Sequence, residues 1–219
     1  MNKPKLSLVV PCFNEEETIP AFYAEANRVL GEMSLSENAE FVFVDDGSTD
    51  GTLSLLETLA ESDSRVHFVS FSRNFGKEAA LYAGLSKARG TFTALLDADL
   101  QDPPSLLPEM LNSLENDGFE CAATRRATRK NEPPVRSFFA RLFYKIMAKM
   151  SDVPVVDGAR DFRLMSESYK NAVLSLCERN RFTKGIFPWV GFKTKWFSYE
   201  NIERVAGKTK CPFLKLFLY

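Results

Sequence analysis

The feature that most constrains the fold is a set of short apolar segments that each lead into polar residues. They are LSLVVP at 6–11, FVFVDDGSTDG at 41–51, VHFVSFS at 66–72 and FTALLDADL at 92–100. Apolar runs of this length, bounded by turn residues, are typical of buried strands. Each segment is therefore interpreted as a strand that ends in a polar loop.

Segments of a different pattern separate these strands and are interpreted as helices, over residues 15–35, 52–62 and 76–89. In the first of them, apolar side chains recur at three- and four-residue spacing. Strands that alternate with helices predict an α/β fold with a mostly parallel sheet flanked by helices. Ligands of such sheets bind at the carboxyl ends of the strands. We therefore expect convergence on one edge of Asn14, Asp45, Asp46, Arg73 and the Asp97/Asp99 pair.

The net charge of −1 conceals an uneven distribution. Residues 1–120 contain 8 Lys/Arg and 21 Asp/Glu, whereas residues 121–219 contain 20 Lys/Arg and 8 Asp/Glu. An acidic half followed by a basic half indicates two different partners. A metal ion suits the first half, and a phosphate or an anionic membrane suits the second. We expect no nucleic-acid partner.

Histidine and cysteine are scarce, which limits the chemistry. The chain has one histidine and four cysteines, none of them in a CxxC pair, so a multi-histidine metal site, a zinc site and a disulfide framework are disfavoured. The N-terminus lacks the apolar length of a signal peptide, and these features predict a cytosolic, reducing location. The apolar residues in CPFLKLFLY at 211–219 lead us to expect that a hydrophobic part follows.

LLDADLQDPP at 95–104 carries the clearest chemical signal. Asp97 and Asp99 would repel each other unless a cation lies between them. Magnesium is usually held by one or two carboxylates, with substrate phosphates completing its shell. The alternative is an aspartate that only caps the next turn, and we favour the divalent cation.

The motif DDGSTDGT at 45–52 also places acids at a strand end. Asp45 or Asp46 is able to accept hydrogen bonds from a ribose or a base. Ser48 or Asp50 is suited to cap the following helix. We interpret the segment as a capped turn in which Asp45 also binds a ligand.

Two more motifs lie at strand-to-helix junctions. In PCFNEEE at 11–17 the backbone is placed to face a nucleotide, although acidic residues also favour a plain helix start. SRNFGKEAAL at 72–81 brings Arg73 and Lys77 to a helix N-terminus, where a diphosphate can bind. The alternative is that Lys77 pairs with a surface acid, and we favour the ligand.

The second half contains a candidate catalytic carboxylate in DGARDFRLM at 157–165. Asp161 lies beside apolar residues, so it could act as a general base near a reaction centre. It could equally pair with Arg160 or Arg163 as a structural salt bridge. Spacing leaves both interpretations open.

A basic, proline-interrupted loop is expected at 124–136, followed by a helix at 136–150. This helix combines apolar aromatic rows with a basic row formed by Arg141, Lys145 and Lys149. Such a helix could lie in a membrane interface or pack on the sheet of its own domain. The width of its aromatic face favours the membrane.

Five motifs in order resemble those of family 2 glycosyltransferases with the GT-A fold: VVPCFNEEE, FVFVDDGSTDGT, FSRNFGKEAALYAGL, LLDADLQDPP and DFRLM. More narrowly, the chain resembles the polyprenyl-phosphate glycosyltransferases, which include bactoprenol glucosyltransferases and, more distantly, dolichol-phosphate mannose synthases. The resemblance covers nearly the whole chain. Relatives continue into C-terminal transmembrane helices, which are expected to follow this chain or to have been removed from it.

The resemblance implies an enzyme that moves a hexose, expected to be glucose, from a UDP-sugar to undecaprenyl phosphate with inversion. The reaction would need Mg²⁺ or Mn²⁺ and take place at the cytoplasmic face of the membrane. A homo-oligomer, such as a tetramer, is also implied. Two alternatives remain: a related transferase with a polysaccharide or protein acceptor, and a non-catalytic module that binds a nucleotide sugar.

The motifs and the resemblance together assign the site residues. Asp99 would be the principal metal ligand, with Asp97 beside it. Asp161, Asp102 and Gln101 are the catalytic candidates. The candidates for nucleotide-sugar binding are Pro11, Phe13, Asn14, Glu15, Asp45, Asp46, Arg73, Lys77, Asp97, Ala98 and Asp99. The candidates for the acceptor phosphate are Arg125, Arg126, Arg129, Lys130, Arg204 and Lys210. Residues 1–125 thus form the donor half and 126–219 the acceptor half.

Overall fold

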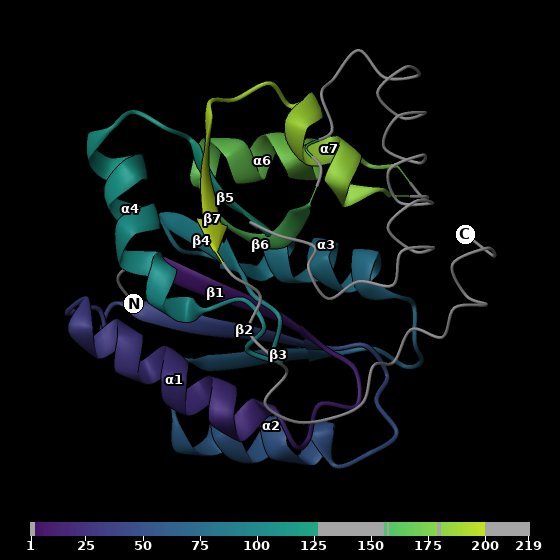
Figure 1. Cartoon of the computed structure of the whole chain (residues 1–219). Helices are drawn as coiled ribbons and strands as arrows, with labels where there is room; N and C mark the ends of the chain where they lie inside the picture. Colours follow the sequence, from purple (N-terminus) through teal and green to yellow (C-terminus); the bar gives the residue numbers. More distant parts are fainter. Residues whose placement is uncertain (1–2, 127–155, 157, 179–180, 200–219) are drawn as a thin grey trace.

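A seven-stranded sheet organises the protein (Figure 1). The computed structural model describes residues 3–126, 156, 158–178 and 181–199. In these residues the strands are β1 (Leu6–Cys12), β2 (Ala39–Asp45), β3 (Val66–Ser70), β4 (Phe92–Leu95), β5 (Cys121–Arg126), β6 (Ala159–Ser166) and β7 (Thr194–Tyr199). The helices are α1 (Ile19–Glu32), α2 (Thr52–Ser62), α3 (Lys77–Lys87), the 3₁₀ turn η1 (Pro104–Leu106), α4 (Leu107–Asn116), α6 (Glu167–Ser175) and α7 (Thr183–Trp189).

The strand order is β3-β2-β1-β4-β6-β5-β7. β1 to β4 pair in parallel, whereas β6 runs antiparallel to both of its neighbours, β4 and β5. β7 pairs in parallel with β5. The predicted mostly parallel sheet flanked by helices is confirmed.

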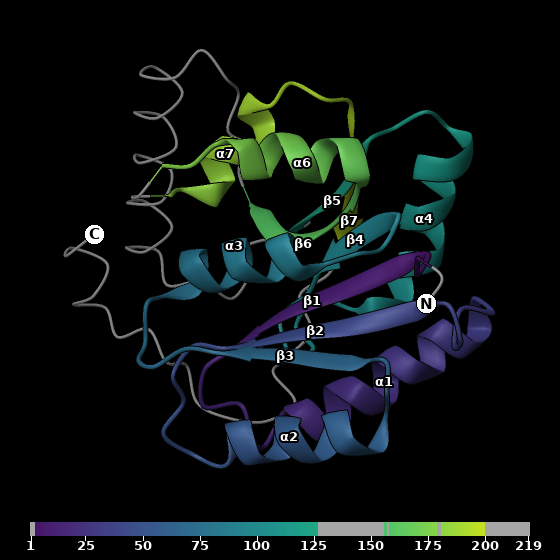
Figure 2. The same ribbon diagram turned by 180° about the vertical axis from the view of Figure 1, so that it is seen from behind.

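Helices cover both faces of the sheet and bury a core on each (Figures 1 and 2). α1, α2 and α4 lie over one face, where Phe22 packs edge-on against Phe43. α3, α6 and α7 lie over the other face, where Val9, Leu81 and Phe187 are buried. The alternation of side chains along each strand explains how β1 serves both cores, with Leu8 in the first and Val9 in the second.

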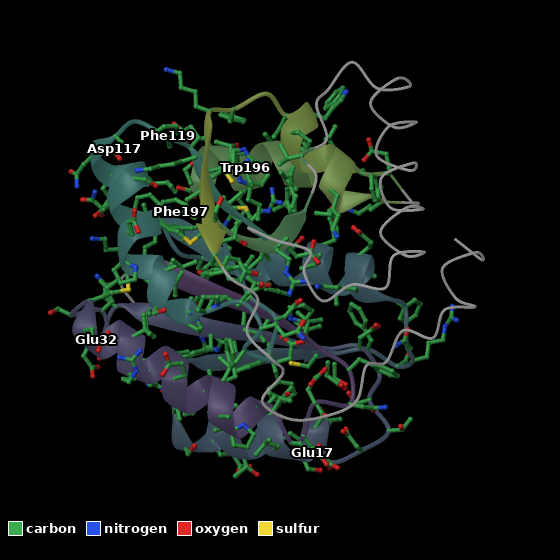
Figure 3. The ribbon with its side chains drawn as sticks, in the orientation of Figure 1. Glu17, Glu32, Asp117, Phe119, Trp196 and Phe197 are labelled. Atoms are coloured by element: carbon green, nitrogen blue, oxygen red, sulfur yellow. The ribbon has the colours of Figure 1, made fainter. Side chains whose placement is uncertain are left out.

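Acidic side chains mark the outside of the first half. Figure 3 shows Glu17, Glu32 and Asp117 at the margin of the ribbon, where all three are exposed.

Among the described residues, no helix combines the length and the apolarity needed to span a membrane.

Two boundaries differ from the sequence expectations. The strand expected over 92–100 ends at Leu95, and a turn follows in which Leu100 has a φ of 56°. Residues 124–126, expected in a loop, belong to β5 instead. Their strand conformation comes from pairing with β6 and β7, which lie far away in sequence. The helix expected at 136–150 lies outside the described residues.

The expected division into two halves at residue 125 falls inside β5. Its pairing partners, β6 and β7, both come from the second half. One sheet therefore contains strands from both halves, and their separate roles remain a functional prediction.

Helix α3 approaches the sheet closely at Gly84. A Cβ atom at this position would lie 2.3 Å from Val9 Cγ1 and 3.2 Å from Val44 Cγ2. Both neighbours are buried valines on central strands, which have little freedom to move. The absence of a side chain at Gly84 thus sets the distance between α3 and the sheet.

We expect Gly84→Ala to lower the free energy of unfolding by about 1–3 kcal/mol, because overpacking outweighs the gain in helix propensity. Gly31→Ala is the matched control, since this helical glycine is exposed and a Cβ atom there would lie 3.8 Å from Ser36 Oγ, an ordinary contact distance. Urea unfolding followed by circular dichroism measures both. A Gly84→Ala chain as stable as Gly31→Ala would contradict the close packing.

Candidate functional site

The loops that follow β1, β2, β3 and β4 meet at one edge of the sheet, as the sequence predicted. In the register, Cys12 at the end of β1 lies beside Asp45, and Asp45 lies beside Ser70 of β3. Because these strands are parallel, their carboxyl ends point the same way. Polar side chains from four separate loops thereby become neighbours.

Asn14 joins the first loop to the second. Its backbone has a φ of 54°, which asparagine tolerates better than most residues. The Thr49 N–H donates to Asn14 Oδ1 at 2.7 Å, and the Asn14 N–H donates to Ser48 Oγ at 2.9 Å. The Glu15 N–H donates to Thr52 Oγ1 at 2.8 Å. In this structure, Asn14 and Glu15 therefore hold two loops in register.

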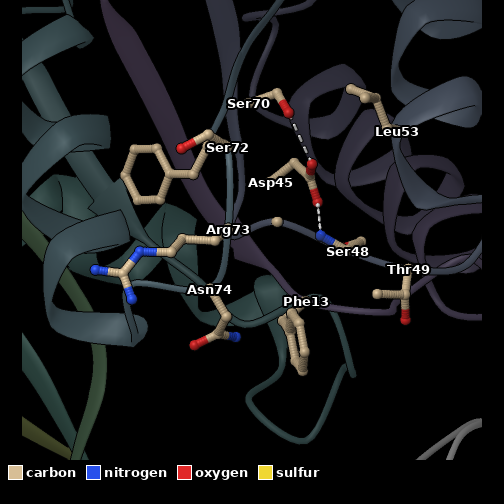
Figure 4. Close-up of a pocket in the computed structure, with 11 residues that line it drawn as sticks. Phe13, Asp45, Ser48, Thr49, Leu53, Ser70, Ser72, Arg73 and Asn74 are labelled. Carbon is tan, nitrogen blue, oxygen red and sulfur yellow. Dashed lines mark hydrogen bonds between the residues drawn. The ribbon is translucent and has the colours of Figure 1, made fainter.

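A pocket of about 470 Å³ opens between these loops (Figure 4). Asp45 is buried there, and Figure 4 shows its carboxylate between Ser70 and Ser48. Its oxygens accept from the Ser48 N–H at 3.1 Å and from the Ser70 hydroxyl at 2.9 Å. The lining residues are Phe13, Asp45, Gly47, Ser48, Thr49, Leu53, Ser70, Phe71, Ser72, Arg73 and Asn74. Aromatic and aliphatic walls with a few fixed polar groups suit a planar, polar-edged ligand.

The pocket includes residues that sequence reasoning did not single out. Ser70 and Ser72 come from the end of β3 and the loop after it, together with Asn74. The available signal was that Ser72 and Asn74 flank Arg73 in the sequence, while Ser70 lies near the end of the strand predicted over 66–72. Leu53 enters from the first turn of α2.

Asp46 holds the loop before α3. It is 4% exposed, and it accepts from the backbone N–H groups of Phe75 at 2.7 Å and Gly76 at 3.0 Å. Burial raises the pKa of Asp46, and these N–H groups only partly offset the effect. Both of these hydrogen bonds tie Asp46 to the loop backbone. Arg73, in the same loop, lies over the exposed ring of Phe75 at 4.4 Å from the ring centroid.

Lys77 joins two of the predicted site acids. Its Nζ lies 2.7 Å from Asp97 Oδ1 and 2.6 Å from Asp161 Oδ2. The sequence alternatives paired Asp161 with Arg160 or Arg163, and Lys77 with a surface acid. The structure instead pairs Asp161, on β6, with Lys77 at the start of α3.

The charges around Asp161 keep it ionised. Burial opposes ionisation, but Lys77 and also Lys184 outweigh it and hold the pKa of Asp161 below its usual range. Burial likewise disfavours the charged form of Lys77, yet Asp97 and Asp161 raise its pKa above the ordinary value. The result is a charged lysine held by two carboxylates.

Asp99 lies in the turn after β4 and is 9% exposed. The Gln101 N–H donates to its Oδ1 at 3.1 Å, and Ala98 beside it is buried. In the described part of the chain, no three acidic, histidine or cysteine side chains are grouped to hold a metal. Mg²⁺ and similar ions accept a ligand set of one or two carboxylates that phosphate oxygens complete. Asp97 and Asp99 fit such an ion.

Asp102 is buried in an ionic cluster. It is 1% exposed and accepts from Arg160 Nε at 2.9 Å and from the Tyr199 hydroxyl. Burial raises its pKa to about 6, although Arg160 lowers it in part. Arg160 Nη2 also reaches Gln101 Oε1 at 3.4 Å. Asp102 and Gln101, two of the three catalytic candidates, are thus tied to β6 and β7. Sequence reasoning missed Arg160 and Tyr199 as their partners.

The predicted acceptor-phosphate residues are only partly described. Arg125 on β5 is exposed, and its Nε donates to Ser198 Oγ at 2.9 Å. Arg126 ends β5. The remaining candidates lie outside the described residues, namely Arg129, Lys130, Arg204 and Lys210. Pro11 lies within β1 and forms part of the site's framework.

The chain matches the profile of Glycosyl transferase family 2 over residues 7–173, a range that includes every described loop of this sheet edge. The chain belongs to glycosyl transferase family 2. The family resemblance predicted from the motifs is therefore confirmed.

Named relatives of this family 2 glycosyltransferase include the prophage bactoprenol glucosyl transferase homolog of Escherichia coli (strain K12). The two are 42% identical over 212 residues, which cover 97% of this chain and 68% of that protein. CsbB of Bacillus subtilis (strain 168), a protein named as a glycosyltransferase, is 39% identical over 219 residues, which cover 100% of this chain and 65% of CsbB. The chain spans about two thirds of the length of the curated relatives that it matches.

Solved structures share the fold of this glycosyltransferase. The mannosyltransferase PcManGT from Pyrobaculum calidifontis, in complex with GDP-Man and Mn²⁺, has a TM-score of 0.62 at 19% identity over 94% of this chain and 58% of that chain. Glucosyl-3-phosphoglycerate synthase from Mycobacterium tuberculosis, in complex with Mn²⁺, UDP-Glc and phosphoglyceric acid, has a TM-score of 0.60 at 19% identity over 98% and 75%. The predicted GT-A fold is confirmed.

Gly47 allows the second and third loops of this glycosyltransferase to touch. Its φ is +67°, and a Cβ atom there would lie 2.3 Å from the backbone carbonyl carbon of Arg73. We expect Gly47→Ala to lower the free energy of unfolding by more than about 1 kcal/mol. Hydrogen exchange at the Phe75 and Gly76 amides should also become faster, because their acceptor Asp46 adjoins Gly47.

Gly51→Ala is the control within the same loop. Gly51 has a φ of −74°, and a Cβ atom there would meet the flexible carboxylate end of Glu16. A smaller effect on stability is therefore expected. If both variants change the hydrogen-exchange rates of the Phe75 and Gly76 amides equally, the contact between Gly47 and Arg73 does not set the loop geometry.

Proposed function

We propose that this chain transfers a hexose, glucose in the first instance, from a UDP-sugar to a polyprenyl phosphate. Relatives named bactoprenol glucosyl transferase, at 42% identity over most of the chain, support this choice of substrates. Undecaprenyl phosphate is the specific acceptor proposed. Transfer would invert the anomeric configuration through direct displacement of the nucleotide.

The observation that carries the proposal is the ionic environment of Asp161. Its carboxylate is held by Lys77 at 2.6 Å, and its pKa lies below the usual range. A carboxylate of low pKa is a weak general base, poorly suited to take a proton from an alcohol near neutral pH. A phosphate monoester has a second pKa of about 6 and is largely ionised at pH 7. An acceptor phosphate therefore needs little help from a base.

The donor would lie along the edge formed by the second and third loops. The pocket around Asp45 and Phe13 suits the nucleoside, and its remaining wall includes Arg73. The start of α3 comes three residues after Asn74 of the pocket wall, with Lys77 as the first residue of the helix. A helix N-terminus with basic side chains nearby favours a diphosphate. This order places the sugar toward the turn that carries Asp99 and Gln101.

A divalent cation, Mg²⁺ or Mn²⁺, would be held by Asp99 and Asp97. When bound, such an ion neutralises the charge that develops on the leaving diphosphate. Solved structures of similar fold contain Mn²⁺ with a nucleotide sugar, which supports a metal of this class. The ligand set in this chain, two carboxylates at the end of β4, supports a site completed by the donor's own oxygens.

The acceptor side would be basic and face an anionic membrane. Residues 121–219 carry 20 Lys/Arg against 8 Asp/Glu, a balance that attracts phosphate and anionic lipid. Arg125, one of the described members of the proposed acceptor set, is exposed on β5. We place the chain at the cytoplasmic face of the membrane and keep a homo-oligomer as part of the proposal.

The first experiment is transfer of labelled glucose from UDP-glucose to undecaprenyl phosphate in detergent, with Mn²⁺ or Mg²⁺ and an EDTA control. A glycolipid product that forms only with metal is expected. Product formation with a polysaccharide or protein acceptor but not with the lipid would favour the alternative transferase. Binding of UDP-glucose without turnover on any acceptor would favour a non-catalytic module.

Asp99→Asn is expected to lower the rate of this transfer by about 100-fold or more, because a neutral amide holds the cation poorly. The fold should remain, as judged by thermal unfolding. Asp117→Asn serves as a control, since Asp117 is exposed and forms an ion pair with Lys195. Unchanged transfer by Asp99→Asn would remove Asp99 from the metal site.

The pH profile tests the acceptor chemistry. We expect kcat/KM for the lipid phosphate to rise between pH 5 and 7 with a midpoint of about 6, as the phosphate loses its second proton. The pKa of Asp102 is also about 6, so Asp102→Asn must be measured in parallel. An unchanged midpoint in that variant assigns the rise to the phosphate, whereas its disappearance would assign the rise to Asp102.

A further inference from the structure

We propose that Lys77 is a built-in counter-ion that occupies Asp97 and Asp161 before the donor binds and thereby makes cation binding depend on the donor diphosphate. The inference rests on the proposed function and adds an order of events to it. Without a donor, the lysine holds the carboxylate that the metal ion needs. With a donor, the lysine has a new anionic partner and releases that carboxylate.

The geometry of the bridge supports this role. Lys77 Nζ lies 2.7 Å from one oxygen of Asp97 and 2.9 Å from the other, and 2.6 Å from Asp161 Oδ2. These distances are those of charge-assisted hydrogen bonds. The ammonium group thus contacts both oxygens of Asp97 and spans to a second acid on β6. The three residues come from α3, from the turn after β4 and from β6.

A metal ion and the ammonium group compete for the oxygens of Asp97 in this arrangement. A divalent cation would need the same carboxylate oxygens that Lys77 now contacts, at about 2.0–2.1 Å for Mg²⁺. Two positive charges around one carboxylate repel each other in a site that is partly shielded from water. The side chains of Asp97 and Asp161 are only 28% and 20% exposed. Binding of the ion to Asp97 therefore requires that Lys77 move away.

Lys77 has the freedom to move when the donor arrives. It is the first residue of α3, and its side chain is 42% exposed. A lysine side chain is a flexible stem with a single charged head, so the head can turn toward an anion at the helix N-terminus while the backbone stays in place. The donor diphosphate thus replaces Asp97 as a partner of Lys77.

The test is a titration of Mn²⁺ into the full chain, followed by electron paramagnetic resonance, without nucleotide and with UDP. For the natural sequence, UDP should tighten Mn²⁺ binding by about tenfold or more. Lys77→Met removes the charge and keeps the length of the side chain. This variant should bind Mn²⁺ about tenfold more tightly than the natural sequence in the absence of UDP, and UDP should add less.

Two further variants separate the bridge from a general effect of charge. Lys77→Arg keeps a cation at this position and should exclude Mn²⁺ without UDP, as the natural sequence does; it also remains informative if Lys77→Met folds poorly. Lys184→Met removes a positive charge that lowers the pKa of Asp161 but, among the described contacts, forms no ion pair with it. Its affinity for Mn²⁺ should change much less than that of Lys77→Met. Thermal unfolding checks the fold of each variant.

The outcomes are distinct. If Lys77→Met binds Mn²⁺ no more tightly than the natural sequence, or if Lys184→Met has the same effect, the inference is wrong while the proposed function stands. Mn²⁺ binding by the natural sequence that is equally tight with and without UDP would also overturn it. Failure of the natural sequence to bind either Mn²⁺ or UDP would contradict the proposed function and this inference together.

Discussion

Parallel pairing of β1 with β2 and β4 is the constraint on which the site depends. The register sets Cys12 beside Asp45, so β1 and β2 end at the same level, and it sets Val9 beside Leu95, so the polar turn after β4 begins beside the last residues of β1. Buried apolar side chains on both faces fix this register, because a shift by one residue would exchange the two faces. The loops that carry the acids are short and follow the strands directly. Their convergence is therefore a consequence of how the core packs.

The buried acids at this edge divide into two kinds. Asp46 and Asp102 are nearly inaccessible, and their hydrogen bonds hold the loop before α3 and the segments of β6 and β7. Asp97 and Asp161 retain some exposure and share Lys77. The first kind shapes the site, and the second kind is the one that we propose to provide charge for a ligand. Acids that are close in sequence can thus have different roles. Burial, and not their spacing in the sequence, decides which carboxylate oxygens a ligand can reach.

Strand β6 brings the second half of the chain into the site. It runs antiparallel between β4 and β5 and places Asp161 opposite the start of α3. The same strand provides Arg160 to Asp102 and the buried Arg163, whose guanidinium lies over Phe187 at 3.4 Å from the ring centroid. Charged groups from both halves consequently meet around one lysine. The Asp102–Arg160 pair joins an acid of the first half to a base of the second, whereas the Lys77–Asp161 pair joins the two halves in the opposite sense.

The sequence by itself determined the α/β pattern, the helix at 52–62 and the polar motifs that follow each of the first four strands, because these depend on local periodicity and on strand ends. It also determined the family, through five motifs in order. Only the tertiary structure decided that 124–126 belong to a strand and that Asp161 pairs with Lys77, 84 residues away in sequence. Those contacts join distant segments, so their partners are chosen by the packing of the whole sheet and leave no local pattern.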